Sequence, residues 1–269
     1  MSEKSEFEDQ GYLGARSLLS PPEIGHLTKI VDRIYRQWLE ENRAAYIENK
    51  LINLHSLTSP KYFQGHEAER LSLFQLLASD RLFSLLDRLF GDELYFHNTQ
   101  LFFNPFKSDQ SPYWHRDLQY TPIDDAAQAA EQLNLLALHV RIPLVPEQGL
   151  ELIPGTHKRW DTDLERNVRL ELNGHHNGEE LPGAVLLELD PGDVLIFHAQ
   201  MIHRGNYRLN ETRKALDLCI GRPHPYTLPY LDKDTLPSAY EQDRIDNARW
   251  YQTARAIART SAPEGCTHP

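Results

Sequence analysis

Apolar residues recur at helical spacing early in the chain. Ser20, two prolines and Glu23 open this stretch, where serine is a favoured N-cap and proline suits the first turn. The apolar residues that predict the helix are Ile24, Leu27, Ile30, Val31, Ile34 and Trp38. Residues 11–19 predict a short strand before this helix, and residues 42–64 predict a mixed loop after it.

Two further helical regions are predicted. One runs from about residue 67 to 90, with a break near Ser79 and with Gly91 as its C-terminal cap. The other lies near the end of the chain, where a capping box opens at Ser238 and predicts a helix to about Arg259.

From Glu93 onward apolar and polar residues alternate, which is typical of strands. Turns rich in Pro and Gly separate the segments, and the turn at 190–193 predicts a hairpin. The segments predicted to hold strands are 93–106, 133–145, 149–157, 183–199 and 213–223.

The order of helices, then many strands, then a helix indicates a mainly β fold. We expect a jelly roll or barrel with flanking helices. The whole chain, residues 1–269, is interpreted as one domain. Within it we predict a helical N-terminal region (residues 1–92), a jelly-roll core (residues 93–223) and a C-terminal helix (residues 238–259).

Charge and cysteine content narrow the class of protein. The formal net charge of −11 opposes general binding to nucleic acid or to anionic lipid. Cys219 and Cys266 are too few for a disulfide framework and are expected to be free thiols in a reducing compartment. The polar N-terminus and the lack of a long apolar run lead us to expect a cytoplasmic protein without a membrane span.

His115 and Asp117 are two residues apart, so on an extended segment both side chains point the same way. A third ligand must come from far along the chain, and His203 follows a predicted strand. Two histidines and one carboxylate on one face of iron(II) leave three positions open, as in non-haem iron oxygenases. We therefore predict that His115, Asp117 and His203 bind iron(II).

Arg213 lies ten residues after His203, at the start of a predicted strand. A guanidinium binds a carboxylate through two parallel hydrogen bonds. Arg213 is thus a candidate to hold the distal carboxylate of 2-oxoglutarate. The alternative is a surface arginine that forms ion pairs with some of the 39 acidic residues.

The motifs together resemble the phytanoyl-CoA dioxygenase family of iron(II)/2-oxoglutarate oxygenases. That family typically shows a WHxD-like segment, an NGxLxxxPGSH-like segment, GDxxxFHxxxxH and an arginine about ten residues on. The corresponding segments here are YWHRD, QGLELIPGTH, GDVLIFHAQMIH and Arg213. Their order and approximate spacing match between about residues 93 and 223.

This resemblance implies a double-stranded β-helix (jelly-roll, cupin-like) core, the three metal ligands named above, and Arg213 as the clamp for 2-oxoglutarate. Gln100 occupies the place of a polar residue that helps to hold the co-substrate in relatives, although a paired strand glutamine is an equal alternative. Relatives often have a serine where Gly205 stands, so Asn206 or another side chain would have to replace that contact. Asp117 favours hydroxylation, because halogenating relatives lack this carboxylate.

His139 and Arg141 lie in an apolar predicted strand, where a charge is costly unless it is paired. Alternation places both on one face, opposite Val140 and its apolar neighbours. If that face is the inside of the barrel, Arg141 would bind an anionic group of the substrate. The alternative is a structural salt bridge with an internal acid such as Glu151. Two other histidines, His157 and His198, are interpreted as structural.

We therefore expect a dioxygenase that uses iron(II), 2-oxoglutarate and O2 to hydroxylate a small organic substrate, with succinate and CO2 as co-products. A metal hydrolase or a metal-binding protein on a cupin-like barrel is the alternative, although neither has a use for Arg213. The identity of the substrate and the oligomeric state are left open.

Overall fold

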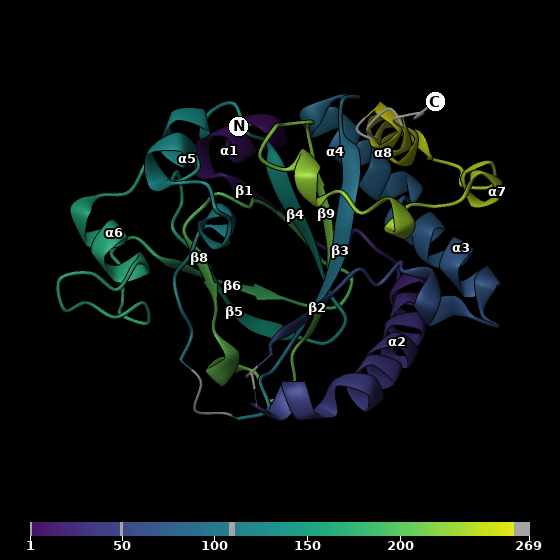
Figure 1. The fold of residues 1–269 in the computed structure, drawn as a ribbon, viewed down its shortest axis with the longest axis horizontal. Helices are drawn as coiled ribbons and strands as arrows, with labels where there is room; N and C mark the ends of the chain where they lie inside the picture. The colour runs from purple at the N-terminus through teal and green to yellow at the C-terminus, as the bar shows by residue number, and fades with distance from the viewer. Residues whose placement is uncertain (1, 49–50, 108–110, 261–269) are drawn as a thin grey trace, which may run out of the picture.

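Two antiparallel β-sheets form the centre of the computed structural model, which describes residues 2–48, 51–107 and 111–260 (Figure 1). The larger sheet has the strand order β1-β7-β4-β9-β3-β2, and the smaller sheet has the order β6-β5-β8. The strands are β1 Tyr12–Ala15, β2 Asn53–His55, β3 Tyr95–Phe103, β4 Ala137–Pro143, β5 Glu147–Leu152, β6 Val185–Leu189, β7 Val194–His198, β8 His203–Gly205 and β9 Lys214–Gly221.

Helices cover the outer face of the larger sheet, with α2, α3, α4 and α8 together on one side in Figure 1. They occupy more of the described chain than the strands do, so the expectation of a mainly β chain holds only for its centre. The helices are α1 Glu3–Gln10, α2 Pro21–Glu48, α3 Glu67–Leu77, α4 Asp80–Phe90, α5 Asp125–Glu131, α6 Asp163–Arg169, α7 Ala239–Gln242 and α8 Arg249–Thr260.

Strand β4 shows how the larger sheet separates core from cavity. Leu138, Val140 and Ile142 point outward and are buried in the hydrophobic core shared with the helices. His139 and Arg141 point inward and line a cavity between the sheets. The predicted split of this strand into an apolar face and a polar face is confirmed.

The predicted hairpin at 190–193 is wrong, although both of its strands exist. Strand β6 pairs with β5 in the smaller sheet, whereas β7 pairs with β1 and β4 in the larger one. The turn between them is tied to the N-terminal segment, because the Asp193 carboxylate accepts a hydrogen bond from the Ser17 backbone N–H at 2.8 Å. The chain thus crosses from one sheet to the other at this turn.

Two predicted boundaries also differ. Helix α2 continues through a kink at Asn42, whose side chain donates to the Trp38 carbonyl at 2.8 Å, so the region predicted as a loop begins later and contains β2. The capping box at Ser238 is confirmed, but it opens the short helix α7, and α8 follows separately. The short helices α1, α5 and α6 were not predicted. The break near Ser79 and the cap at Gly91 are confirmed.

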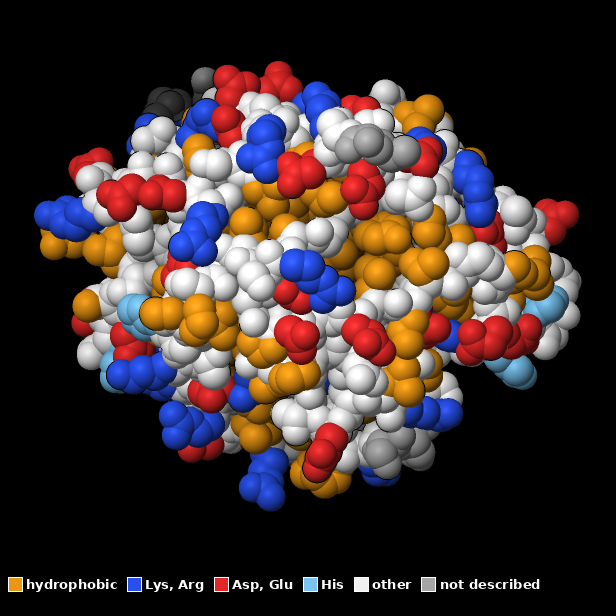
Figure 2. Space-filling view, turned by 180° about the vertical axis from the view of Figure 1, so that it is seen from behind, with side chains coloured by type: hydrophobic (Ala, Val, Ile, Leu, Met, Phe, Trp, Pro, Cys, Tyr) orange, Lys and Arg blue, Asp and Glu red, His pale blue; other side chains and the backbone are white. Residues whose placement is uncertain are grey.

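No helix of the described residues is long and apolar enough to span a bilayer. On the face drawn in Figure 2, basic side chains are scattered among acidic ones, with apolar side chains between them. Cys219 is buried as a free thiol, and Cys266 lies outside the described residues.

Candidate metal centre

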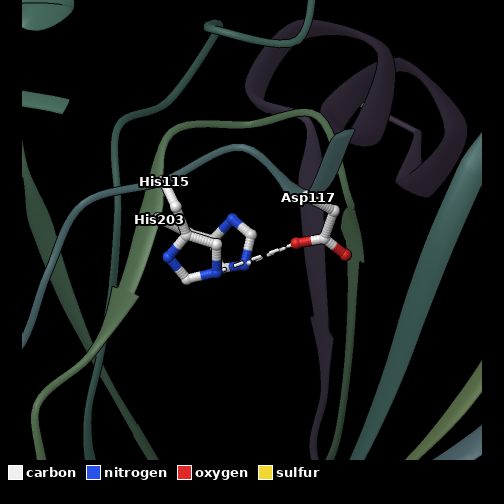
Figure 3. A group of neighbouring side chains, drawn as sticks. All are labelled: His115, Asp117 and His203. Carbon is white, nitrogen blue, oxygen red and sulfur yellow. Dashed lines mark ion pairs between the residues drawn. The ribbon is translucent and has the colours of Figure 1, made fainter. Parts of the chain in front are cut away.

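The three predicted ligands converge in the structure (Figure 3). His203 begins β8, and His115 pairs with it through two backbone hydrogen bonds of 3.0 Å. Oδ1 of Asp117 lies 3.4 Å from Nε2 of His203 and 3.7 Å from Nε2 of His115. One ligand atom from each residue lies within 4.8 Å of the others, which is close enough for one ion.

The second ring nitrogen of each histidine is already occupied. Nδ1 of His115 lies 3.2 Å from the Tyr113 carbonyl, and Nδ1 of His203 lies 3.0 Å from the Met201 carbonyl. Since a carbonyl only accepts, each Nδ1 carries the proton and each Nε2 keeps a free lone pair. Such contacts orient metal-binding histidines in many proteins.

Electrostatics favour the same protonation states. Burial lowers the pKa of His203 to about 3, and it lowers the pKa of His115 as well. Loss of solvation would raise the pKa of Asp117, but the charge of His139 and its hydrogen bond outweigh this effect and hold the pKa of Asp117 well below its usual range. At neutral pH the site therefore offers two neutral imidazoles and one carboxylate, which is the donor set that suits iron(II).

Thr156 forms hydrogen bonds to both chain segments that carry the predicted ligands. Its Oγ1 accepts a hydrogen bond from the Ile202 N–H at 3.0 Å, next to His203. Its carbonyl accepts from Nη1 of Arg116 at 2.8 Å, and Arg116 stands between His115 and Asp117. Arg116 is fully buried and also pairs with Asp161 at 2.8 Å. The segment that contains Thr156 thus holds the ligands without contacting a metal.

A cavity of about 420 Å³ opens beside the three ligands. Both sheets contribute to its walls, which include the three predicted ligands and a set of aromatic and polar residues. The lining also includes Gln100, Phe102, Tyr113, Tyr120, Tyr207 and Arg213. This volume is typical of pockets that bind small molecules.

Arg213 lies in this cavity, just before β9, and it is buried. Its Nε donates to Glu147 at 2.6 Å, and the guanidinium lies over the rings of Phe102 and Tyr207 at 5.4 and 5.6 Å. This position excludes the predicted alternative of a surface arginine. A Cβ on Gly205 would come within 2.7 Å of Nη1 of Arg213, so glycine at 205 makes room for the guanidinium.

Gln100 also lines the cavity, and its Oε1 accepts a long hydrogen bond of 3.5 Å from Asn53. Its role toward a co-substrate stays a prediction. Asn206, considered as a substitute for the missing serine, instead turns its amide toward Glu151 at 3.4 Å.

The expectation that Arg141 awaits an anionic substrate is corrected. Its Nε and Nη2 donate to Asp217 at 2.9 and 3.0 Å, and Nη1 donates to Glu147 at 3.3 Å. The alternative salt bridge is therefore the correct one, but the suggested partner Glu151 pairs with Arg204 instead. Asp217 and Glu147 were missed, although Asp217 stands opposite Arg141 in the β4–β9 register.

His139, the other residue predicted to border the substrate, lies between two acids. Its Nε2 is 2.7 Å from Oδ2 of Asp117, and its Nδ1 is 2.9 Å from Oδ2 of Asp217. Burial opposes a charge on the ring, but the carboxylates of Asp117 and Asp217 outweigh it and raise the pKa of His139 well above its ordinary value. Both ring nitrogens are thus occupied by protein groups.

His157 and His198 have the predicted structural contacts. His157 lies 3.3 Å from the Glu8 carbonyl, and Nε2 of His198 lies 2.9 Å from the Leu135 carbonyl. Nδ1 of His198 accepts from the Gln200 N–H at 3.1 Å, which requires a neutral ring. Burial accordingly lowers the pKa of His198 to about 4.

Stability should therefore fall as the pH is lowered from about 6.5 to about 4. In this window the unfolded chain takes up a proton at His198 and the folded chain does not, which costs about 1.4 kcal/mol per pH unit. The His198→Gln variant should show a shallower pH dependence in urea unfolding, while the exposed control His176→Gln keeps the original one. An unchanged slope in His198→Gln would contradict the assignment.

Comparisons with known proteins agree with this geometry. The sequence pattern of the phytanoyl-CoA dioxygenase family matches residues 7–215. An ectoine dioxygenase of Sphingopyxis alaskensis is 23% identical over 224 residues, which cover 78% of this chain and 71% of that protein. An ectoine dioxygenase of Nocardia farcinica is 24% identical over 159 residues, or 58% of this chain and 50% of that protein.

Solved structures show the same fold at low identity. EctD from S. alaskensis, crystallised with 2-oxoglutarate and 5-hydroxyectoine, has a TM-score of 0.56 and 18% identity, covering 90% of this chain and 86% of that one. AviO1 from Streptomyces viridochromogenes also has a TM-score of 0.56 and 18% identity, and the match covers 82% of this chain and 94% of that one.

The family pattern and the ectoine dioxygenase relatives place the chain among the non-haem iron(II)/2-oxoglutarate oxygenases, and the convergent histidines and carboxylate form the donor set that suits iron(II). Within that class the chain belongs to the phytanoyl-CoA dioxygenase family, whose pattern covers most of its length.

Proposed function

We propose that this protein hydroxylates a small organic substrate at an iron(II) held by His115, Asp117 and His203. The observation that carries the proposal is that each histidine presents a lone pair at Nε2 while its Nδ1 is already bound to a carbonyl. When bound, iron(II) would couple the oxidative decarboxylation of 2-oxoglutarate to oxidation of the substrate, with succinate and CO2 as co-products.

Arg213 is proposed to bind the distal carboxylate of 2-oxoglutarate. Glu147 fixes the guanidinium through Nε, and neither terminal nitrogen donates a hydrogen bond to another of the described residues. Those two nitrogens form the fork that matches a carboxylate. Gln100, on the neighbouring strand β3, is proposed as a further polar contact to the co-substrate.

The substrate is proposed to occupy the rest of the cavity, beside the metal and near Tyr113, Tyr120 and Tyr207. The relatives named ectoine dioxygenase act on a small molecule, which fits a site of this size. Arg141 is paired with Glu147 and Asp217, so it does not require the substrate to carry an anionic group.

Two sheets that enclose the cavity, with ligands from both the β8 edge and the segment after β3, support a double-stranded β-helix core. We propose one catalytic domain over residues 1–269. Helices α2–α4 and α8 share a single hydrophobic core with the larger sheet, which supports this assignment.

Anaerobic spectroscopy tests the reaction class. Addition of iron(II) and 2-oxoglutarate to the purified protein should produce a weak visible charge-transfer band, because the 2-oxo acid chelates the metal at its open positions. Zinc(II) with 2-oxoglutarate, the matched control, should produce no such band. A metal hydrolase or a simple metal-binding protein would show no visible band with iron(II) either, and that result would reject the proposal.

A further inference from the structure

Each oxygen of the Asp117 carboxylate faces a different partner. Oδ1 faces the two ligand histidines, at 3.4 and 3.7 Å from their Nε2 atoms. Oδ2 lies 2.7 Å from Nε2 of His139 on the opposite side. The carboxylate is therefore already divided between a metal-facing oxygen and a protein-facing oxygen.

His139 is itself held by two side chains besides Asp117. Its ring stacks on Phe197, with ring centres 5.1 Å apart and an interplanar angle of 13°. Its Nδ1 contacts Asp217, and Asp217 is fixed by two parallel hydrogen bonds from Arg141. All of these side chains are buried, so the ring has little freedom to turn away from Asp117.

We propose that His139 is a positioning residue that restricts Asp117 to ligation through Oδ1 alone, an inference that rests on the proposed iron site. A carboxylate with both oxygens free can chelate a metal and occupy a second position. The proposed reaction needs three open positions, two for 2-oxoglutarate and one for O2. A charge-assisted hydrogen bond to Oδ2 prevents the loss of one of them.

The same series of side chains reaches the proposed co-substrate clamp. Arg141 donates to Oε1 of Glu147, and Nε of Arg213 donates to the same oxygen. Asp117, His139, Asp217, Arg141, Glu147 and Arg213 thus form one continuous line of alternating acids and bases. The metal-binding carboxylate and the carboxylate-binding arginine are positioned by one buried network.

A pair of amide substitutions separates positioning from packing. The amide nitrogen of glutamine occupies the place of Nε2 of histidine, and that of asparagine occupies the place of Nδ1. His139→Gln therefore keeps a donor for Asp117 and loses the one for Asp217, whereas His139→Asn does the reverse. The dissociation constant for iron(II), measured anaerobically on the full chain, and the urea unfolding midpoint are determined for both.

We expect His139→Asn to bind iron(II) about 10- to 100-fold more weakly than the wild type, as outer partners of metal ligands usually do when removed. His139→Gln should recover most of that loss, although it should be the less stable variant because the buried Asp217 loses one of its three hydrogen bonds. The 2-oxoglutarate charge-transfer band should change in the asparagine variant and persist in the glutamine variant. The proposal would be overturned if the less stable variant were also the one that binds iron(II) more weakly. It would also be overturned if His139→Asn bound iron(II) as tightly as the wild type.

The wild-type protein supplies an independent check if a variant does not fold. In a crystal structure with iron(II) grown without oxygen, Asp117 should bind through Oδ1 with Oδ2 on His139, and a chelating Asp117 would overturn the inference. Failure of the wild type to bind iron(II) would instead reject the proposed function, so the two failures are distinguishable.

Discussion

Alanine in place of Asp117 should abolish iron-dependent turnover of 2-oxoglutarate. The substitution removes the only carboxylate among the three convergent ligand atoms, and it leaves Nε2 of His139 without its partner. Two neutral imidazoles bind iron(II) more weakly than a set that includes an anionic oxygen. Anaerobic iron titration and succinate formation in air measure the two expected losses.

The matched control is Glu188→Ala, which removes an exposed acid from β6, away from the cavity. It should retain iron binding and turnover. Full succinate formation by Asp117→Ala, in a protein that keeps the wild-type unfolding midpoint, would show that the metal lies elsewhere.

The second large effect is expected at Arg213. Arg213→Ala should raise the KM for 2-oxoglutarate about ten- to a hundredfold, because a charge-assisted hydrogen bond contributes roughly 1.5–3 kcal/mol. Arg213→Lys should lie between the alanine variant and the wild type, since lysine keeps the charge but lacks the fork. Initial rates over a range of 2-oxoglutarate concentrations give the KM values.

Arg36→Ala, on the exposed face of α2, controls for the loss of a positive charge and should leave the KM unchanged. Arg213→Ala also removes a partner of the buried Glu147, so unfolding midpoints are needed alongside the kinetics. An unaltered KM in a folded Arg213→Ala would place the distal carboxylate on another residue.

The convergence of His115, Asp117 and His203 was predictable because its signals are local or ordered along the chain. His115 and Asp117 share a face through their two-residue spacing, and His203 follows a strand that the apolar pattern marks clearly. The inward direction of His139 and Arg141 followed from the same alternation. The directions of His139 and Arg141 depend only on the period of a strand.

The partners of those residues depend on which strands become neighbours, and the pattern does not contain that information. Arg141 meets Asp217 because β4 lies beside β9, although 76 residues separate the two along the chain. The turn at 190–193 has the composition of a hairpin, yet its strands belong to different sheets because Asp193 binds the segment near Ser17. Contacts between segments distant in the sequence therefore determine both the partner of Arg141 and the sheets to which β6 and β7 belong.

The anchoring of the ligand segments by Thr156 and Arg116 bears on what metal binding would do to the fold. Thr156 and Arg116 tie down the backbone beside all three ligands, so the conformational entropy of ordering the site is lost during folding rather than when the metal binds. In a zinc finger, by contrast, the metal itself drives folding. Here the binding free energy of the ion does not have to offset the cost of ordering its ligands. Removal of the ion by a chelator should therefore leave the protein folded.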